Sequence, residues 1–500
     1  MWHPETVARP DSDLKVNHGT GMDKKQLAAL TEGRFELAFA RCELRQRGAD
    51  DPHVLVGSGF LAQDKDGALL LRMAAHEERT DVQVLKMEFS QSWAAGQLIP
   101  ETAYYDLKAW TVSGTEWRAE RVSPNMDYGM HGTAARIRLR RIETREQWEQ
   151  FAEHTKITVS IPEELDLPWH IWTKKGEFGG ATDKFEHDTG KFSWIAHKEN
   201  GQTTLVFYPD GESVEPAFTH FWRGLHIVLG RLIESQSFFI VEGHWRTKRL
   251  ASRVRTTSKR RLAPPIRGLA FDAEHFHAFI AAFLEHGTLQ RDEGGVAKQG
   301  GHSDLIYRHW QRISDAWEND LENSALVLSV AIEGLIKEAF ASKHDVDAEF
   351  IDQLDRAKPI LEKTALDKRA RDCVLASIGN ARAPRVGGVL RRLVEQGALH
   401  DGHVQAWSAL RNTAAHGGTL ADDDLALQAY IDRFHVCLDL FYRLVFVIIG
   451  YRGHHRDYSV VCSPAQQEWP IVPFPPVPPP TAPAVEVGPV PEGEGPTPST

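Results

Sequence analysis

The chain has 500 residues, of which 42% are hydrophobic and 25% are charged, with a formal net charge of -11 and a pI near 6.1. This composition is typical of a soluble globular protein, and the length exceeds what one hydrophobic core usually holds, so we expect two or three domains. The acidic balance excludes a protein coated in positive charge, so any contact with nucleic acid requires a local basic patch.

Cysteine usage and hydropathy indicate the compartment. The cysteines are scattered, without the paired spacing of a zinc site or a disulfide framework, at positions 42, 373, 437 and 462, which favours a reducing compartment. The N-terminus has no basic-then-apolar signal segment, and the most apolar run, residues 438–450, contains Asp439 and Arg443 and is too short to span a bilayer. We therefore expect a cytoplasmic protein without membrane contact, metal ion or cofactor.

The first half of the chain has the patterns of strands. Residues 1–30 are polar and aperiodic and predict a loose lead-in. From residue 35 to about residue 213, apolar residues alternate around turn signals such as Asp64–Gly67. Asn200-Gly201 accept positive φ at both turn positions and predict a hairpin. We expect a β-rich domain over residues 31–290, built as sandwich-like antiparallel sheets.

The end of this predicted domain mixes helices and strands. Residues 216–232 have a helical apolar period, residues 237–241 and 249–255 read as strands, and Asp272 can cap a helix that ends near residue 287. Residues 287–303 contain two glycine pairs. They predict a linker between two domains or an exposed loop.

The pattern from Asp304 onward is helical almost throughout. Apolar stripes at helical spacing predict an all-α bundle over residues 304–455, in which Asp422 caps a long final helix. Residues 463–500 are rich in proline and cannot bury a core, so they predict a disordered, extended tail. The predicted fold class is therefore α+β and multidomain.

One helix of the bundle groups polar side chains that could act on a phosphodiester. Residues 406–415 predict an amphipathic helix that stops at Gly417-Gly418. Arg411, Asn412 and His416 lie in its last turns, and Asn412 and His416 share a face. The spacing of the arginine and histidine alone decides little, because a histidine that caps a helix C-terminus, where a cation is favoured, gives the same pattern.

The bundle resembles a HEPN domain, in particular that of the ApeA-like anti-phage defence family. Arg411-Asn412-Thr413-Ala414-Ala415-His416 matches the Arg-Asn-x-x-x-His of this family, and the predicted helix over residues 327–340 carries Glu333. A β-rich half followed by a helical bundle is also the ApeA-like arrangement. The resemblance implies a metal-independent endoribonuclease that cleaves RNA by attack of the 2′-hydroxyl and leaves a 2′,3′-cyclic phosphate.

The resemblance assigns a role to each matched residue. His416 is the acid or base at the 2′-hydroxyl or the leaving 5′-oxygen, and its ordinary pKa suits proton transfer near neutral pH. Arg411 holds the scissile phosphate through its forked guanidinium. Asn412 orients the phosphate or the imidazole. Glu333 orients Arg411, although an ordinary solvated glutamate explains it equally well. HEPN toxins controlled by adenylylation often carry a tyrosine where this chain has Gly418, so that control is not expected.

The resemblance also implies partners. HEPN nucleases usually pair their motifs across a dimer, so we expect a homodimer through the bundle, with RNA as the substrate. In an abortive-infection system the N-terminal domain would sense a phage-derived trigger.

Two basic stretches are candidates for RNA contact through phosphate binding. One places arginines on one face of a strand, at positions 136, 138 and 140. The other is a longer run with the candidates Arg246, Lys248, Arg249, Lys259, Arg260 and Arg261. For both, a solvated face paired with local carboxylates is the alternative.

Two other functions fit the same sequence. One is a catalytically inactive HEPN module that dimerises or binds a nucleotide, with the β-rich domain as a ligand-binding sensor. The other is a carbohydrate- or peptide-binding protein that uses tryptophans of the first half, although these are as well suited to a core: Trp110, Trp117, Trp169, Trp172 and Trp194.

Overall fold

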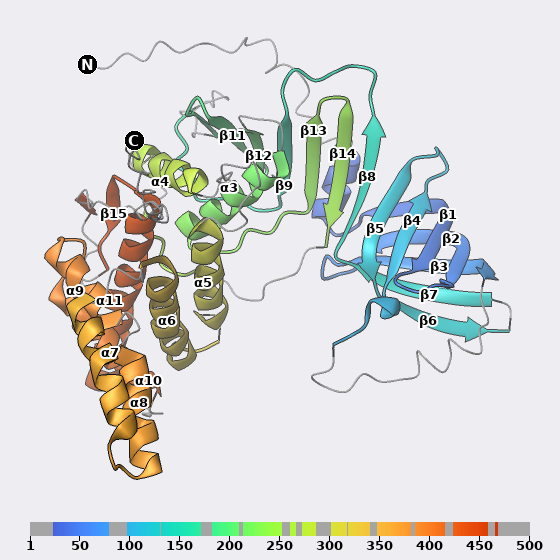
Figure 1. Cartoon of the computed structure of the whole chain (residues 1–500). Helices are drawn as coiled ribbons and strands as arrows, with labels where there is room; N and C mark the ends of the chain where they lie inside the picture. The colour runs from blue at the N-terminus through green and yellow to red at the C-terminus, as the bar shows by residue number, and fades with distance from the viewer. Residues whose placement is uncertain are drawn as a thin grey trace, which may run out of the picture.

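The fold is α+β, as predicted, with an antiparallel sheet in the N-terminal half and helices in the C-terminal half (Figure 1). The computed structural model describes residues 24–79, 98–130, 132–171, 183–209, 214–252, 261–266, 273–286, 302–317, 319–340, 348–381, 386–415, 424–458 and 466–468. The predicted proline-rich tail, residues 463–500, lies outside these ranges except for residues 466–468.

A single hydrogen-bonded sheet contains 14 of the described strands, in the order β10-β11-β12-β9-β13-β14-β8-β5-β4-β1-β2-β3-β7-β6. Its β1–β8 part curls, so that β5 and β7 come into contact although they are not neighbours in the sheet (Figure 1). The strands are β1 (Glu36–Gln46), β2 (Val54–Gln63), β3 (Leu69–Arg79), β4 (Tyr105–Trp110), β5 (Glu116–Val122), β6 (Pro124–Gly129), β7 (Gly132–Leu139), β8 (Arg141–Gln147), β9 (Lys156–Ile161), β10 (Lys184–Asp188), β11 (Phe192–Glu199), β12 (Gln202–Pro209), β13 (Ser237–Glu242) and β14 (Trp245–Ala251).

Two predicted turns are confirmed. Asn200 and Gly201 join β11 to β12 with φ of 52° and 76°, the left-handed values that a two-residue hairpin needs. Between β2 and β3, the Asp64 carboxylate accepts hydrogen bonds from the backbone N–H groups of Asp66 and Ala68 at 2.9 and 2.8 Å, and Gly67 has φ of 85°. Short polar side chains and glycine therefore fix both turns locally.

Gly57 lies where the register of β2 against β3 shifts. An alanine Cβ at this position would lie 2.0 Å from the Ala74 carbonyl oxygen, which cannot move without breaking the sheet. We expect Gly57→Ala to lower the free energy of unfolding by about 1–3 kcal/mol. Gly379→Ala is the control, because nothing lies within 4 Å of its Cβ and alanine favours a helix by about 0.5–1 kcal/mol. Urea-unfolding midpoints that move in the same direction for both variants would contradict the steric explanation.

The helices follow the predicted order with shifted ends. They are α1 (Lys24–Thr31), a 3₁₀ turn η2 (Glu101–Ala103), α3 (Val214–Leu229), α4 (Ala273–Glu285), α5 (His302–Trp317), α6 (Leu321–Leu335), a π-helical turn η4 (Ile336–Phe340), α7 (Ala348–Lys363), α8 (Lys368–Ala381), α9 (Val386–Glu395), α10 (Asp401–Ala415) and α11 (Asp424–Ile449). A short pair, β15 (His454–Arg456) with β16 (Gln466–Glu468), follows. Within the ranges described, no helix is long and apolar enough to cross a membrane.

The lead-in and one strand differ from the prediction. Residues 24–31 form α1 rather than a loose segment, because Leu30 is fully buried in the first core. The strand expected at residues 249–255 begins at Trp245, since a tight turn at Gly243, with φ of 57°, lets it pair with β13.

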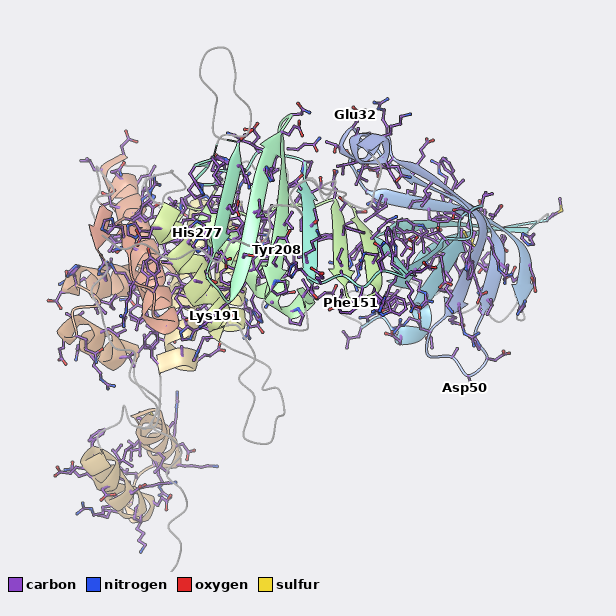
Figure 2. All side chains as sticks on the ribbon, turned by 90° about the horizontal axis from the view of Figure 1, so that it is seen from above. Glu32, Asp50, Phe151, Lys191, Tyr208 and His277 are labelled. Carbon is purple, nitrogen blue, oxygen red and sulfur yellow. The ribbon has the colours of Figure 1, made fainter. Side chains whose placement is uncertain are left out.

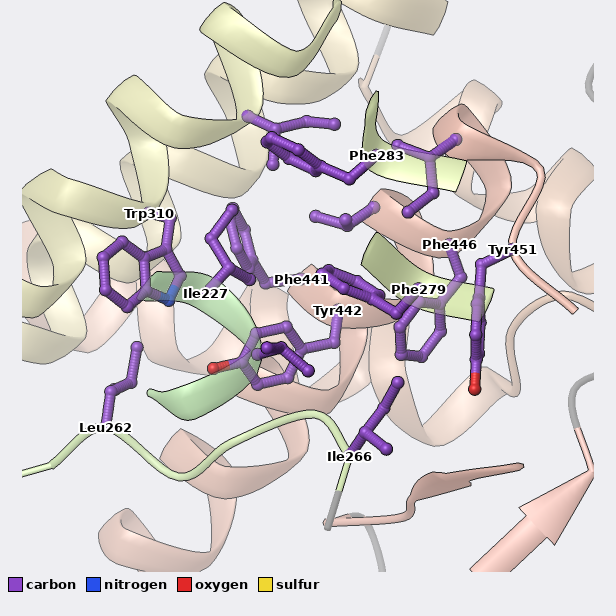
Figure 3. Packing of buried hydrophobic residues seen from close by; sticks show 14 of the residues in the cluster. Ile227, Leu262, Ile266, Phe279, Phe283, Trp310, Phe441, Tyr442, Phe446 and Tyr451 are labelled. Atoms are coloured by element: carbon purple, nitrogen blue, oxygen red, sulfur yellow. The ribbon is translucent and has the colours of Figure 1, made fainter. Parts of the chain in front are cut away.

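Two hydrophobic cores divide the chain at a place other than the predicted linker. The first lies inside the curled β1–β8 part and includes Leu250 of β14. The second runs without interruption from β9–β13 through α3 and α4 into the helical bundle. Figure 3 shows Ile227 of α3, Phe279 of α4 and Trp310 of α5 packed around Tyr442 of α11. Residues 287–303 therefore do not separate two independent cores.

Candidate active site

Packing of α6 against α10 positions the predicted catalytic residues. The Asp320 carboxylate caps α6 by accepting from the Asn323 backbone N–H at 2.6 Å, as expected of an N-cap aspartate. From α10, Trp407 and Leu410 are buried, and the Trp407 indole N–H donates to the Ser329 carbonyl oxygen at 3.2 Å. This bond fixes the rotation and height of α10 on α6.

Glu333 of α6 and Arg411 of α10 form an ion pair, which is the contact that the HEPN resemblance suggested rather than a solvated glutamate. Arg411 Nε donates to Glu333 Oε2 at 2.9 Å, while Lys337 Nζ donates to the other carboxylate oxygen at 2.6 Å. The hydrogen bond from Lys337, together with that from Arg411, outweighs burial and lowers the pKa of Glu333. The carboxylate is therefore ionised at neutral pH and can hold the arginine in one orientation.

The Arg411 guanidinium is held at its base and open at its tip. Its Cζ lies 5.8 Å from the centroid of the Trp407 ring, and the side chain is 47% exposed. Only Nε takes part in a hydrogen bond or ion pair with the described residues. The terminal nitrogens can thus bind a phosphate in the bidentate manner that favours arginine over lysine.

Asn412 and His416 complete the predicted set. Asn412 is exposed on α10, directly after Arg411. α10 is described as far as Ala415, so His416, Gly417 and Gly418 lie outside the described residues. The structure brings Glu333 and Arg411 together, and the role of His416 stays a prediction.

The longer basic run is partly occupied by internal contacts. Arg249 donates to Glu143 at 2.8 Å and to Glu215 at 2.7 Å, which ties β14 to β8 and α3. Arg246 donates to the carbonyl oxygens of Gly243 and Trp245. Arg261 pairs with Asp166, Lys248 is half-buried, and Lys259 and Arg260 lie outside the described residues. RNA binding by this run stays a prediction. Arg249 is the member least available to bind a phosphate, because two carboxylates already hold its guanidinium.

The strand face with three arginines has the predicted alternation. Arg136 and Arg138 of β7 and the adjacent Arg140 are exposed, whereas Ile137 and Leu139 between them are fully buried. Arg138 lies 3.6 Å from the Asp64 carboxylate at the edge of this face, a contact that both solvent and salt screen.

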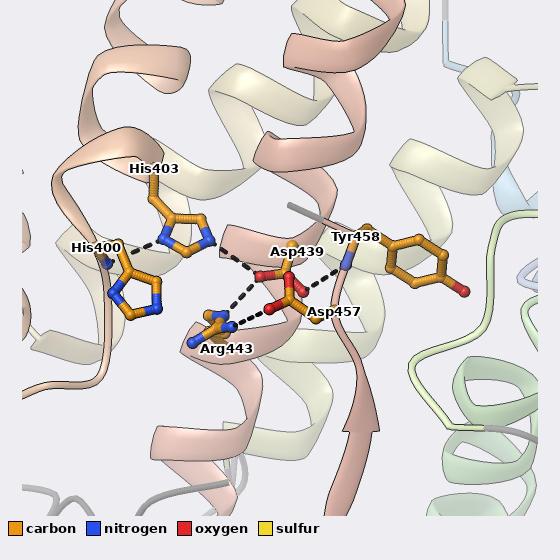
Figure 4. Close-up of polar contacts among 6 residues, drawn as sticks. All are labelled: His400, His403, Asp439, Arg443, Asp457 and Tyr458. Atoms are coloured by element: carbon orange, nitrogen blue, oxygen red, sulfur yellow. Dashed lines mark hydrogen bonds and ion pairs between the residues drawn. The ribbon is translucent and has the colours of Figure 1, made fainter. Parts of the chain in front are cut away.

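A second polar cluster has the composition of a catalytic dyad but a different role. His403 of α10 is 1% exposed, and its Nε2 lies 3.0 Å from Asp439 Oδ2 of α11 (Figure 4). Its Nδ1 accepts from the His400 backbone N–H at 3.0 Å, so Nε2 carries the proton and donates to Asp439. Both ring nitrogens are occupied, and no group of this ring is left for a substrate.

Asp439 is the centre of this cluster. Besides His403, it accepts from Arg443 Nε at 2.6 Å and, through Oδ1, from the Tyr458 backbone N–H at 3.2 Å, while Arg443 also donates to Asp457 (Figure 4). Burial alone would raise the pKa of Asp439, but the hydrogen bond from His403 and the charge of Arg443 bring it below its ordinary value. The cluster fastens the start of α10 to α11 and to the segment after it. The one feature of the sequence that pointed to this cluster was the pair Asp439 and Arg443, four residues apart in an otherwise apolar stretch.

Most of the tryptophans proposed as a binding surface belong to the cores where they are described. Trp117 and Trp194 are buried and Trp169 packs against the second core. Trp110 is partly buried with Arg41 over its ring at 5.5 Å, and Trp172 lies outside the described residues.

A different set of aromatic residues is exposed where β8, β13 and β14 end. Trp148 is 51% exposed and Phe151 is 66% exposed. Phe151 is labelled in Figure 2. Arg246 lies over the Trp148 ring at 5.5 Å, and Phe151 packs edge-on against His244 at 5.2 Å. Stacked aromatic and guanidinium groups of this kind favour flat or apolar ligands.

The α6–α10 surface therefore offers an oriented guanidinium, the carboxylate that orients it, and an exposed amide one residue on. These groups can bind and polarise a phosphate. Comparison of the chain with protein-family models, with curated proteins and with solved structures gave no match.

Proposed function

We propose that the protein is a metal-independent HEPN-type endoribonuclease that acts in anti-phage defence. The observation that supports this most directly is the ion pair between Glu333 and Arg411, two residues selected from the sequence that lie 78 positions apart and meet at 2.9 Å. A glutamate on α6 orients an arginine on α10, which packs against it, and His416 follows five residues after the arginine in sequence. This is the arrangement that the HEPN resemblance implies.

The proposed reaction is an internal transesterification. The ribose 2′-oxygen attacks phosphorus and loses its proton to a base, the bond from phosphorus to the 5′-oxygen breaks, and the leaving oxygen takes up a proton. The products are a 2′,3′-cyclic phosphate and a 5′-hydroxyl. Arg411 stabilises the negative charge that develops on the phosphoryl oxygens, and His416 transfers a proton at the 2′- or 5′-oxygen.

The proposal extends to partners and location. The enzyme would act in the cytoplasm as a homodimer through its helical bundle, and the β-rich half would sense a phage-derived trigger. RNA would bind across the exposed α6–α10 surface, with Asn412 orienting the phosphate or the imidazole.

Purified full-length protein and Glu333→Ala, incubated with RNA in EDTA, test the proposal. The wild type should yield 2′,3′-cyclic phosphate ends, and the variant should cleave roughly ten- to a hundredfold more slowly, because a poorly oriented arginine stabilises the transition state less. The pair is partly exposed, so the free energy of unfolding should fall by no more than about 1 kcal/mol. Glu395→Ala, at an exposed position on α9, is the control. Cleavage that requires a metal ion, or that is unchanged in Glu333→Ala, would contradict the proposal.

A second candidate is a catalytically inactive HEPN module whose β-rich half is a ligand-binding sensor. The exposed cluster around Trp148 and Phe151 favours it, because exposed apolar residues that gather in one patch mark interaction sites. RNA left intact by the wild type across a range of phage lysates, together with a lysate component that quenches the tryptophan fluorescence of the wild type but not of Trp148→Phe, would favour this candidate over the nuclease.

A further inference from the structure

A groove lies between α5 and α6, one turn away from the ion pair. Its volume is about 420 Å³, within the range of small-ligand sites. One wall is apolar and comes from α6, with the residues Leu326, Val327, Val330 and Ala331. Leu326 and Val330 are 38% and 54% exposed. The groove therefore offers an apolar surface that nothing in the described chain covers.

The other wall contains a buried imidazole without a hydrogen-bond partner. His309 of α5 is 4% exposed, and neither ring nitrogen has a partner in the described chain. Its Nε2 lies 3.6 Å from Glu338, beyond hydrogen-bond length. The ring packs against α6 at Gly334, where a Cβ would lie 2.5 Å from it. Burial lowers the pKa of His309, so the ring is neutral and offers one donor and one acceptor.

A cation and an acid lie at the rim. Arg312 and Asp315 of α5 are exposed and line the groove, and Arg312 makes no hydrogen bond or ion pair with any described residue. Arg308, one turn earlier on the same helix, instead lies 4.0 Å from Glu338. The groove thus combines an apolar wall, a neutral imidazole and an unpaired guanidinium, which together suit a nucleobase and its phosphate.

The groove is close to the proposed scissile phosphate. Val330 of its wall and Glu333, which holds Arg411, are three residues apart on α6, and such positions place their Cβ atoms about 5–6 Å apart. A subunit contact needs roughly 800 Å² per partner, whereas two exposed apolar side chains form only a small patch. We propose that the groove binds the base of the RNA nucleotide next to the scissile phosphate, an inference that rests on the proposed nuclease function.

Binding of an RNA analogue that cannot be cleaved tests the groove separately from catalysis. Full-length protein is titrated with a fluorescent 2′-O-methyl oligonucleotide, which lacks the attacking hydroxyl, and Kd is measured by anisotropy. Arg312→Ala and Val330→Asp should weaken binding about tenfold or more. Arg308→Ala and Val374→Asp, the latter at a 37% exposed position on α8, are matched controls and should bind like the wild type. The base preference of cleavage should change in the first two variants only.

Each alternative gives its own result. Unchanged binding and unchanged base preference in Arg312→Ala and Val330→Asp would overturn the inference while leaving the nuclease proposal intact. Binding that depends on Arg312 without any RNA cleavage would support the groove and contradict the nuclease. A Val330→Asp protein that becomes monomeric in light scattering would assign the groove to a second copy of the chain. If a free nucleoside monophosphate binds tightly and the oligonucleotide does not displace it, the groove is a site for a soluble nucleotide. That result would overturn the inference that the groove binds a base of the RNA substrate.

Discussion

Replacement of His416 by alanine should reduce RNA cleavage by about 10²–10⁴-fold, the contribution of a positioned acid–base group. α10 is described as far as Ala415, with Arg411 held by Glu333, and the HEPN resemblance assigns proton transfer to His416, the residue that follows. The variant removes the group that transfers the proton and leaves the arginine that binds the phosphate. Cleavage rates in EDTA should therefore fall while the Kd for the uncleavable oligonucleotide stays within about threefold of the wild type.

The matched control is His154→Ala, which removes an exposed imidazole from the β-rich half. It should cleave at the wild-type rate. Equal rates for His416→Ala and His154→Ala would show that His416 only caps the end of α10, the structural alternative to catalysis.

Replacement of Asp439 by alanine should destabilise the protein by about 3–5 kcal/mol, because it leaves the buried cation Arg443 without its closest partner. His403 and the Tyr458 backbone N–H lose their acceptor in the same step. Urea unfolding followed by circular dichroism measures the change. Asp432→Ala, two turns earlier on α11, removes a carboxylate that accepts a hydrogen bond from the exposed Gln428, its one hydrogen-bond partner among the described residues, and should cost less than about 1 kcal/mol. Similar losses in both variants would show that the cluster contributes nothing specific.

The same carboxylate gives a pH dependence with a definite sign. The hydrogen bond from His403 and the charge of Arg443 outweigh burial and hold the pKa of Asp439 below its ordinary value. A lowered pKa in the folded state contributes stability above the unfolded value, about 3.9, and that contribution is lost as the pH falls through the folded value. The free energy of unfolding of the wild type should therefore decrease below about pH 4. Asp439→Asn should flatten this part of the curve.

Local patterns predicted the elements and part of the site. The helical period of apolar residues predicted the bundle, and Asn200-Gly201 predicted a hairpin. Both predictions succeed because helices and tight turns are set by residues close together in sequence. The pairing of Glu333 with Arg411 was suggested only by the HEPN resemblance, which places an acidic residue on an earlier helix, and a solvated glutamate was the alternative. The placement of His309 in a groove could not be predicted, since it depends on how closely α5 packs on Gly334. Strand order could not be predicted for the same reason. Trp245 of β14 pairs with Gln147 of β8, far apart in the chain, and no local signal sets that register.

The continuity of the second core has a consequence for synthesis on the ribosome. The first core can close once Leu250 has emerged, since all its members lie before that point. Phe279 belongs to the second core and packs edge-on against Phe446 of α11, so it stays uncovered on that side until α11 has been made. While the intervening helices are translated, this aromatic side chain is exposed to solvent. We expect the nascent chain to engage chaperones during that interval and to aggregate when translation stops before α11.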